Sequence, residues 1–149
     1  MKDGKEKLGE ALIKELITKA LQARELSYSP YSAYQVGAAL LTKGQEIYTG
    51  CNIENAAYSP TNCAERTAFF KAVSEGKREF CAIAIVGGPR GKEITGYAYP
   101  CGVCRQVMAE FCDADTFQVI VAKSESKYVI KTLQELLPDG FGAGNLEVG

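Results

Sequence analysis

The sequence has 149 residues, six Cys and no His, with 46% hydrophobic residues, 23% charged residues and a formal net charge of -1. This length fits one domain with a sizeable core, and the near-neutral charge argues against a nucleic-acid-binding surface, which usually carries a basic excess. The absence of His excludes a Ser–His–Asp or Cys–His catalytic pair and any His-ligated metal. A metal would therefore be held by thiolates or carboxylates.

Taken in chain order, the hydrophobic pattern predicts the elements α-β-β-α-β-α-β-β-α, with a hairpin turn at 43–45 and a Gly-rich loop at 87–98. The predicted helices span 8–23, 63–74, 102–111 and 132–136, and the predicted strands span 34–42, 46–51, 81–86, 117–122 and 127–131, the last as an edge strand. This alternation predicts one α/β domain, over residues 1–149, with two or three layers around a mixed sheet. We expect residues 1–8 to form a disordered extension.

The N-terminal region is laced with charge. It contains no uncharged apolar run of signal-peptide length, and no stretch of about 18 apolar residues occurs anywhere in the sequence. We therefore expect a cytoplasmic protein with no membrane partner. Because Cys in that compartment are kept reduced, metal ligands or core thiols are expected here in place of disulfides.

Three Cys lie where two predicted helices begin, and a helix N-terminus lowers the pKa of a thiol. Cys101 and Cys104 are one helical turn apart, so their sulfurs can face a common point to which Cys63 can add a third thiolate. Three protein ligands with one open position are the pattern of a catalytic zinc site. Glu65, two residues after Cys63, can lie near the metal without binding it, which is the place for a general acid–base group.

The charge of such a site needs an offset, since three thiolates leave Zn²⁺ with a net charge of about -1. Arg66, three residues after Cys63, and Arg105, directly after Cys104, could supply it. Simpler interpretations stay open: a lone C-x-x-C is often a redox pair or half of a structural zinc site. Glu65 and Arg66, each taken alone, could be ordinary residues of a helix's first turn.

The other three Cys could supply a fourth thiolate and close the site, which would make the zinc structural. They are Cys51, Cys81 and Cys112. We expect them to be core thiols instead, because free Cys is among the most buried residue types.

The sequence resembles the cytidine deaminase family, in its small, homotetrameric, Cys-only class. The C-x-E and P-C-x-x-C motifs match the signature of the zinc nucleobase deaminases, and the resemblance runs from about Tyr28 to Phe141. The matching segments are YQVGAALL from Tyr34, GCNIENAAY from Gly50, CAERTA from Cys63, KAVSEG from Lys71 and QELLP from Gln134. The resemblance implies a three-layer α-β-α cytidine-deaminase-like fold around a mixed five-stranded sheet.

The resemblance also implies the activity: zinc-dependent hydrolytic deamination of cytidine and deoxycytidine to uridine and deoxyuridine, with release of ammonia, in pyrimidine salvage. It implies one Zn²⁺ per subunit on Cys63, Cys101 and Cys104, and sites at the interfaces of a homotetramer. Glu65 would move protons between water, ring N3 and the departing ammonia. The remaining implied roles are Asn52 and Glu54 at the ribose 3′-hydroxyl, Ala64 and Tyr34 at the base and sugar, Phe141 on the base in a neighbouring subunit's site, and Arg66 and Gln106 near the ligand sulfurs.

Some positions depart from the family pattern. Tyr34 stands where the family usually has Phe, and it could instead be a core strand residue; Phe141 could be a mobile tail residue. Tyr99 and Val103 replace the more usual Ser and Ala, and the 87–98 loop differs in length and composition. The departures at Tyr99 and Val103 lie outside the ligand set, so these two concern local packing and not the chemistry.

Other functions make different predictions. A blasticidin-type deaminase would share the two motifs but lack the Cys51–Asn55 segment in this form, so Asn52 favours a substrate with a ribose. A non-catalytic zinc module predicts a fourth Cys ligand, and thiol–disulfide exchange through Cys101 and Cys104 predicts activity without metal. A nucleic acid partner is not expected, because no aromatic residues interleave with basic ones to hold a strand.

Overall fold

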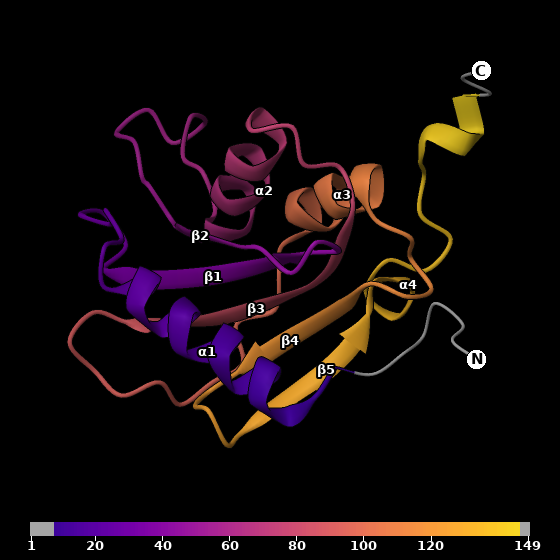
Figure 1. The fold of residues 1–149 in the computed structure, drawn as a ribbon. Helices are drawn as coiled ribbons and strands as arrows, with labels where there is room; N and C mark the ends of the chain where they lie inside the picture. The colour runs from indigo at the N-terminus through magenta and orange to yellow at the C-terminus, as the bar shows by residue number, and fades with distance from the viewer. Residues whose placement is uncertain (1–7, 147–149) are drawn as a thin grey trace.

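The structure, a computed structural model, describes residues 8–146 and consists of one mixed sheet between two helical layers (Figure 1). In chain order the elements are α1 (Glu10–Arg24), β1 (Tyr34–Thr42), β2 (Ile47–Cys51), α2 (Ala64–Ser74), β3 (Phe80–Pro89), α3 (Gly102–Phe111), β4 (Gln118–Ala122), β5 (Tyr128–Thr132), α4 (Leu133–Leu136) and a 3-10 helix (Ala143–Leu146). The strand order is β2-β1-β3-β4-β5, with β3 and β4 parallel and the other pairs antiparallel. The predicted element order, hairpin and edge strand are confirmed.

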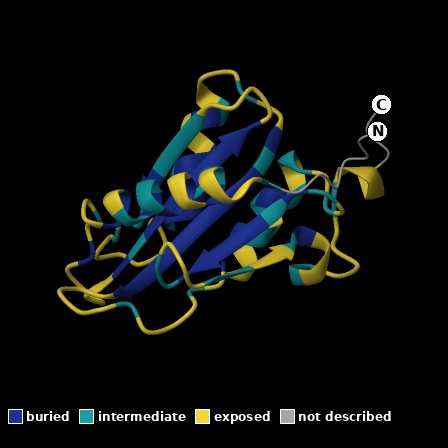
Figure 2. Cartoon of the chain, turned by 60° about the horizontal axis from the view of Figure 1, so that its bottom comes forward, coloured by how far each residue is buried: buried dark blue, intermediate teal, exposed yellow. Residues whose placement is uncertain are grey.

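Two apolar cores cover the two faces of the sheet, and this confirms three layers. On one face, Leu16 and Ile17 of α1 pack against the strands; on the other, Phe69 of α2 and Met108 of α3 do so. All four side chains are fully buried, and Figure 2 shows the central strands as the most buried part of the chain. The helix N-termini that carry the three predicted ligands lie in the layer formed by α2 and α3.

The α1 helix approaches the sheet so closely that β1 needs a glycine beneath it. A Cβ atom on Gly37 would lie 2.0 Å from the Ala20 carbonyl oxygen. At the end of α1, the buried Arg24 donates from Nε to the Gln35 carbonyl (3.1 Å) and from Nη2 to the Gly88 and Pro89 carbonyls (3.1 and 2.9 Å). One guanidinium thus joins the helix to two neighbouring strands.

Strand β3 is longer than predicted, since the sequence pattern places its last three residues in the Gly-rich loop. Gly87 and Gly88 pair with Val36 and Gln35 of β1. The two glycines read as loop residues in the sequence, yet a Cβ on Gly87 would lie 2.9 Å from the Ala98 Cβ. Packing of the following segment over the strand, and not a turn, therefore accounts for Gly87.

The two ends of the chain are described only in part. Within the predicted extension, residues 1–7 lie outside the described residues, and Leu8 is half-buried against the α1 core. The C-terminal tail after α4 contains the 3-10 helix Ala143–Leu146, which the sequence pattern does not predict. Within the described residues, no helix has both the length and the apolar character that a membrane span requires.

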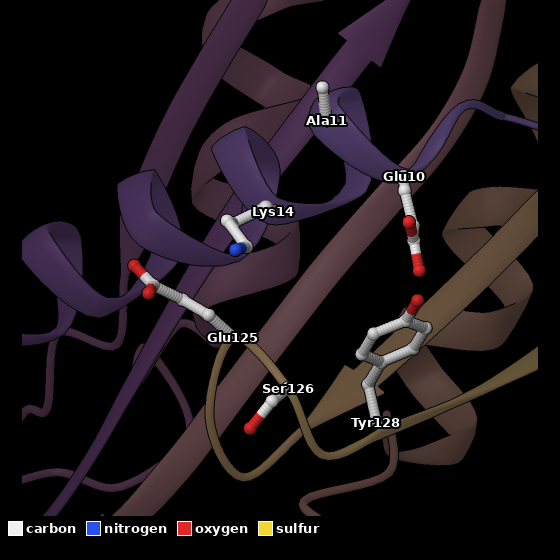
Figure 3. Close-up of a pocket in the computed structure, with 6 residues that line it drawn as sticks. All are labelled: Glu10, Ala11, Lys14, Glu125, Ser126 and Tyr128. Atoms are coloured by element: carbon white, nitrogen blue, oxygen red, sulfur yellow. The ribbon is translucent and has the colours of Figure 1, made fainter.

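A cavity of about 470 Å³ lies on the α1 side, between α1 and the turn that joins β4 to β5 (Figure 3). It is lined by Glu10, Ala11, Lys14, Glu125, Ser126 and Tyr128. The Thr18 hydroxyl donates to the Glu125 carboxylate and ties the helix to that turn. This cavity is on the opposite face of the sheet from α2 and α3, so it is separate from the three predicted ligands.

Candidate metal centre

The sulfur atoms of Cys63, Cys101 and Cys104 lie within 4.8 Å of one another. The Sγ–Sγ distances are 3.9 Å between Cys63 and Cys101 and 3.5 Å between Cys101 and Cys104. Three sulfurs at about 2.3 Å from a tetrahedral zinc ion lie about 3.8 Å apart, so the three thiols fit Zn²⁺. The structure thus brings together the predicted ligands from two different helices.

All three ligands are placed by the start of a helix. Cys63 is the N-cap residue of α2 and Cys101 is the N-cap residue of α3, and both have extended backbone dihedral angles. Cys104 lies in the first turn of α3 and is almost fully buried. The two N-termini direct their unpaired N–H groups and positive dipole ends toward the thiolates, which stabilises negative charge there.

Hydrogen bonds shift the pKa values of the Cys63 and Cys104 thiols in opposite directions. The Cys104 thiol and the Arg66 guanidinium hydrogen-bond to Cys63 and lower the pKa of Cys63 to about 5, although burial opposes this. The same bond to Cys63, with burial, raises the pKa of Cys104 well above its ordinary value. Without a metal, the protein therefore favours a thiolate at Cys63 and a thiol at Cys104, and a bound divalent cation would favour the thiolate at both.

Glu65 has the environment of a buried acid–base group. Its side chain is 4% exposed in the first turn of α2. Burial raises the pKa of Glu65 from about 4.5 to about 7, and the Cys63 thiolate adds to this, while the positive charge of Arg66 opposes it. A carboxyl group with a pKa near neutrality can both accept and donate a proton at physiological pH.

The two arginines beside the ligands make different contacts. Arg66 Nη2 donates to Cys63 Sγ at 3.3 Å. Burial lowers the pKa of Arg66, but hydrogen bonds to Cys63 and Cys104 outweigh it, so the group stays charged. Arg105 instead donates to two carbonyl groups, Pro100 and Leu136. Of the two arginines, therefore, only Arg66 makes the expected contact with a ligand sulfur.

The Gln106 side chain contacts the C-terminal tail. Its Nε2 donates to the Phe141 carbonyl at 2.8 Å. The Phe141 side chain is 58% exposed within this single chain. The structure therefore ties Phe141 to the ligand helix through its backbone and leaves its ring free.

Asn52, directly after β2, is held by the start of β1. Its Oδ1 accepts from the Val36 N–H (2.9 Å) and the Ser27 hydroxyl (2.5 Å), and its Nδ2 donates to the Tyr34 carbonyl (2.9 Å). An amide nitrogen carries two hydrogens, so one donor of Asn52 is left for a ligand.

Glu54 holds the loop before β1. It accepts from the N–H groups of Tyr31 (2.9 Å) and Ser32 (3.1 Å) and from the Ser32 hydroxyl. These bonds, with the Ser32 hydroxyl first, lower the pKa of Glu54. The carboxylate therefore stays an acceptor at neutral pH.

The last two predicted contacts lie at element starts. Ala64 is fully buried as the first residue of α2, where helix N–H groups have no partner within the helix. Tyr34 is the first residue of β1 and is 40% exposed, which is more than a core strand residue would show.

Sequence reasoning missed Thr67, which joins the two halves of the site. Its hydroxyl oxygen lies 3.0 Å from the Cys51 carbonyl and 3.1 Å from the Cys63 carbonyl, and it accepts from Asn62 Nδ2. It therefore connects the end of β2, which precedes Asn52, to the N-cap of α2. The spacing of four residues from Cys63 was the available signal, but the partner in β2 could not be inferred from it.

The remaining three Cys do not join the cluster within the described residues. Cys51, Cys81 and Cys112 are half-buried, so the expectation of core thiols is met only in part. Cys81 and Cys112 pack against the two cores, and burial raises the pKa of Cys112. The sulfur set stays at three, which leaves a tetrahedral ion one open position.

Comparisons with known proteins agree with this site. Residues 11–121 match the family model described as the cytidine and deoxycytidylate deaminase zinc-binding region. A cytidine deaminase of Halalkalibacterium halodurans is 51% identical over 88% of this chain and 95% of its own, and one of Sporosarcina psychrophila is 48% identical over 90% and 94%. The crystal structure of a Burkholderia pseudomallei cytidine deaminase, 46% identical, covers 85% of this chain and 97% of its own with a TM-score of 0.77. The chain therefore belongs to the cytidine deaminase family.

Proposed function

We propose that this protein hydrolyses cytidine and deoxycytidine to uridine and deoxyuridine and releases ammonia, as a step of pyrimidine salvage. The observation that carries the proposal is the buried Glu65 carboxyl beside three thiols that fit a zinc ion. When bound, Zn²⁺ supplies Lewis-acid activation of water. Three thiol ligands and one carboxyl that does not bind the metal are the set that such a hydrolysis requires.

Glu65 would carry the protons. Deamination at C4 of cytosine needs one proton moved from water to ring N3, and a second proton moved from the new C4 hydroxyl to the leaving amine. A buried carboxyl with a pKa of about 7 can make each of these transfers near neutral pH. Arg66 would keep negative charge on the Cys63 sulfur from opposing the loss of the first proton.

Asn52 and Glu54 would bind the sugar. The free hydrogen of the Asn52 amide could donate to the ribose 3′-oxygen, and the Glu54 carboxylate could accept from the 3′-hydroxyl. Neither contact involves the 2′-position, which is why both ribo- and deoxyribonucleosides are proposed as substrates. Tyr34 and the Ala64 N–H would contact the base and sugar.

We also propose a homotetramer with sites at subunit interfaces. Several large apolar side chains are exposed in the single chain: Val103, which lies between two ligands in the sequence, is 56% exposed, and Tyr58 and Phe141 are 74% and 58% exposed. Exposed large apolar side chains favour an interface where they form one patch. Light scattering in solution should give four times the chain mass of 16.1 kDa.

The test is ammonia release from cytidine by the purified protein and by Glu65→Gln. The wild type should release ammonia, and Glu65→Gln should keep zinc and fold but lose turnover by at least about 100-fold, the usual minimum contribution of an acid–base group. Glu110→Gln, an exposed position on α3, is the matched control and should be fully active. Unchanged turnover in Glu65→Gln would contradict the proposed role.

Substrate comparison separates this proposal from its alternatives. Cytidine should be turned over far better than blasticidin S, since only the nucleoside offers a ribose to Asn52 and Glu54. A non-catalytic zinc module would release no ammonia from either compound. A thiol–disulfide exchange protein would reduce disulfides after chelation of the metal, and this result would replace the proposal.

A further inference from the structure

Arg105 bridges two carbonyl groups that lie far apart in the sequence. Its Nε donates to the Pro100 carbonyl at 2.6 Å and its Nη1 donates to the Leu136 carbonyl at 2.7 Å. Pro100 is buried and directly precedes the zinc ligand Cys101, and Leu136 is the last residue of α4. Arg105 itself directly follows the ligand Cys104. The Arg105 side chain therefore connects the start of the ligand turn, at Pro100, to the end of α4, where the C-terminal tail begins.

The ligand turn is also closed from within. The Arg105 backbone N–H donates to the Cys101 carbonyl at 2.9 Å, as the first helical hydrogen bond of α3. The Arg105 side chain then returns to the residue before Cys101. Backbone and side chain of one residue thus set the orientation of the segment that carries Cys101 and Cys104.

The tail is bound to the same helix by the next residue, since the Gln106 amide donates to the Phe141 carbonyl at 2.8 Å. Figure 1 shows the tail passing beside α3 after it leaves α4. Leu136 and Leu137 at this exit pack against the core that α2 and α3 share. Both ends of the 136–141 segment are therefore bound to α3: Leu136 accepts from Arg105, and Phe141 accepts from Gln106.

We propose that Arg105 is a positioning residue for the zinc site, which clamps the Pro100–Cys104 ligand turn to the end of α4 and so couples zinc binding to the order of the 136–141 segment. The role depends on geometry and not on charge. A guanidinium offers donors in a rigid planar fork, whereas an ammonium is a compact point charge on a flexible stem. Lysine would keep the charge at position 105 but would not hold two carbonyls in this fixed arrangement.

The first experiment measures zinc affinity by competition with a chromophoric chelator in Arg105→Lys and Arg105→Gln. Both variants should bind zinc about 10–100-fold more weakly than the wild type, the usual cost of losing an outer contact of a metal site. Arg78 is the matched control, because its Nη1 also donates to two carbonyls, Val73 (2.7 Å) and Lys77 (3.0 Å), away from the metal. Arg78→Lys should leave zinc affinity unchanged.

Two outcomes of this experiment would overturn the proposal. Wild-type zinc affinity in Arg105→Lys together with weak binding in Arg105→Gln would show that charge and not the clamp matters, and would overturn the proposal. Wild-type affinity in both variants would overturn it as well. Because the inference rests on the zinc site and not on the substrate, a wild type that binds zinc without deaminating cytidine would contradict the proposed function and leave this test valid.

A second experiment needs no variant and remains available if Arg105→Gln fails to fold. Hydrogen–deuterium exchange of the full chain is compared with zinc bound and after chelation under reducing conditions. Coupling is reciprocal, so chelation should increase exchange at 136–141 as well as at 101–105, and leave the 123–127 turn on the far side unchanged. Equal exchange at 136–141 in both states, or a uniform increase along the chain, would overturn the proposal.

Discussion

Gly50 of β2 lies against Ala64, the first residue of α2, at a distance that leaves no room for a side chain. A Cβ atom on Gly50 would lie 2.5 Å from the Ala64 carbonyl oxygen and 2.6 Å from the Ala68 amide nitrogen. Both partners are backbone atoms of the helix that positions Cys63 and Glu65, so they can move only if the helix moves. The closeness of this contact therefore sets the position of the site relative to the sheet.

From this contact we predict that Gly50→Ala displaces the N-terminal turn of α2. The free energy of unfolding should fall by about 1–3 kcal/mol, the usual cost of overpacking, and kcat/KM for cytidine should fall as well. Gly96→Ala is the control, because nothing lies within 4 Å of a Cβ placed there. Denaturant unfolding and steady-state kinetics measure both effects; full activity in Gly50→Ala would show that the helix start does not need its present position.

Arg66→Gln removes both a hydrogen bond to Cys63 Sγ and a positive charge beside the sulfurs. We expect zinc affinity or kcat/KM to fall by about 10–100-fold, as for other residues that contact metal ligands. The zinc affinity and kcat/KM of Arg66→Lys should lie between those of Arg66→Gln and the wild type, since lysine keeps the charge but loses the planar donor arrangement. If Arg66→Gln matched the wild type in both measurements, the charge of the tris-thiolate site would need another source of compensation.

The sequence was most informative where chemistry depends on local spacing. Cys101 and Cys104 are one turn apart on one helix, so their common direction follows from helix geometry alone. The contacts of Arg105 and Thr67 could not be predicted in this way, because their partners, Leu136 and Cys51, come from other elements. A position within one helical turn of a ligand predicts the same role for Arg66 and Arg105, and only the fold separates them.

The fold shows the same division. Apolar runs located every strand of the sheet, but Gly87 and Gly88 read as a loop because glycine has two meanings in a sequence. It marks a turn in one place and close packing in another. Which meaning holds depends on the side chain that lies above the strand, here Ala98, and this neighbour is known only from the folded structure.

The buried Glu65 carboxyl predicts a pH-dependent stability in the metal-free protein. Its pKa is about 7 in the folded state, above a usual value of about 4.5. Because the pKa is raised in the folded state, protonated Glu65 makes its full contribution to stability below about pH 4.5, and this contribution is lost as the pH rises through about 7. Glu65→Gln removes this loss, so its stability relative to the wild type should increase by about 2–3 kcal/mol between about pH 5 and about pH 8.

Urea unfolding of chelated, reduced protein across this pH range measures the difference, with Glu110→Gln as an exposed control on α3. A constant difference between Glu65→Gln and the wild type would mean that Glu65 stays ionised in the fold. Its proposed ability to accept and donate protons near neutral pH would then need the metal.

The proposed tetramer makes a prediction that single variants cannot test. If Phe141 acts in a neighbouring subunit's site, Glu65 and Phe141 of one working site come from different chains. Chains carrying Glu65→Gln and chains carrying Phe141→Ala should each be impaired, the second through a higher KM because a base-stacking contact is lost. When the two are unfolded together and refolded as mixed tetramers, about a quarter of the sites should combine an intact Glu65 with an intact neighbouring Phe141. The mixture should then exceed the mean activity of its parents at low cytidine concentration, whereas a mixture that equals this mean would place Phe141 in its own chain's site.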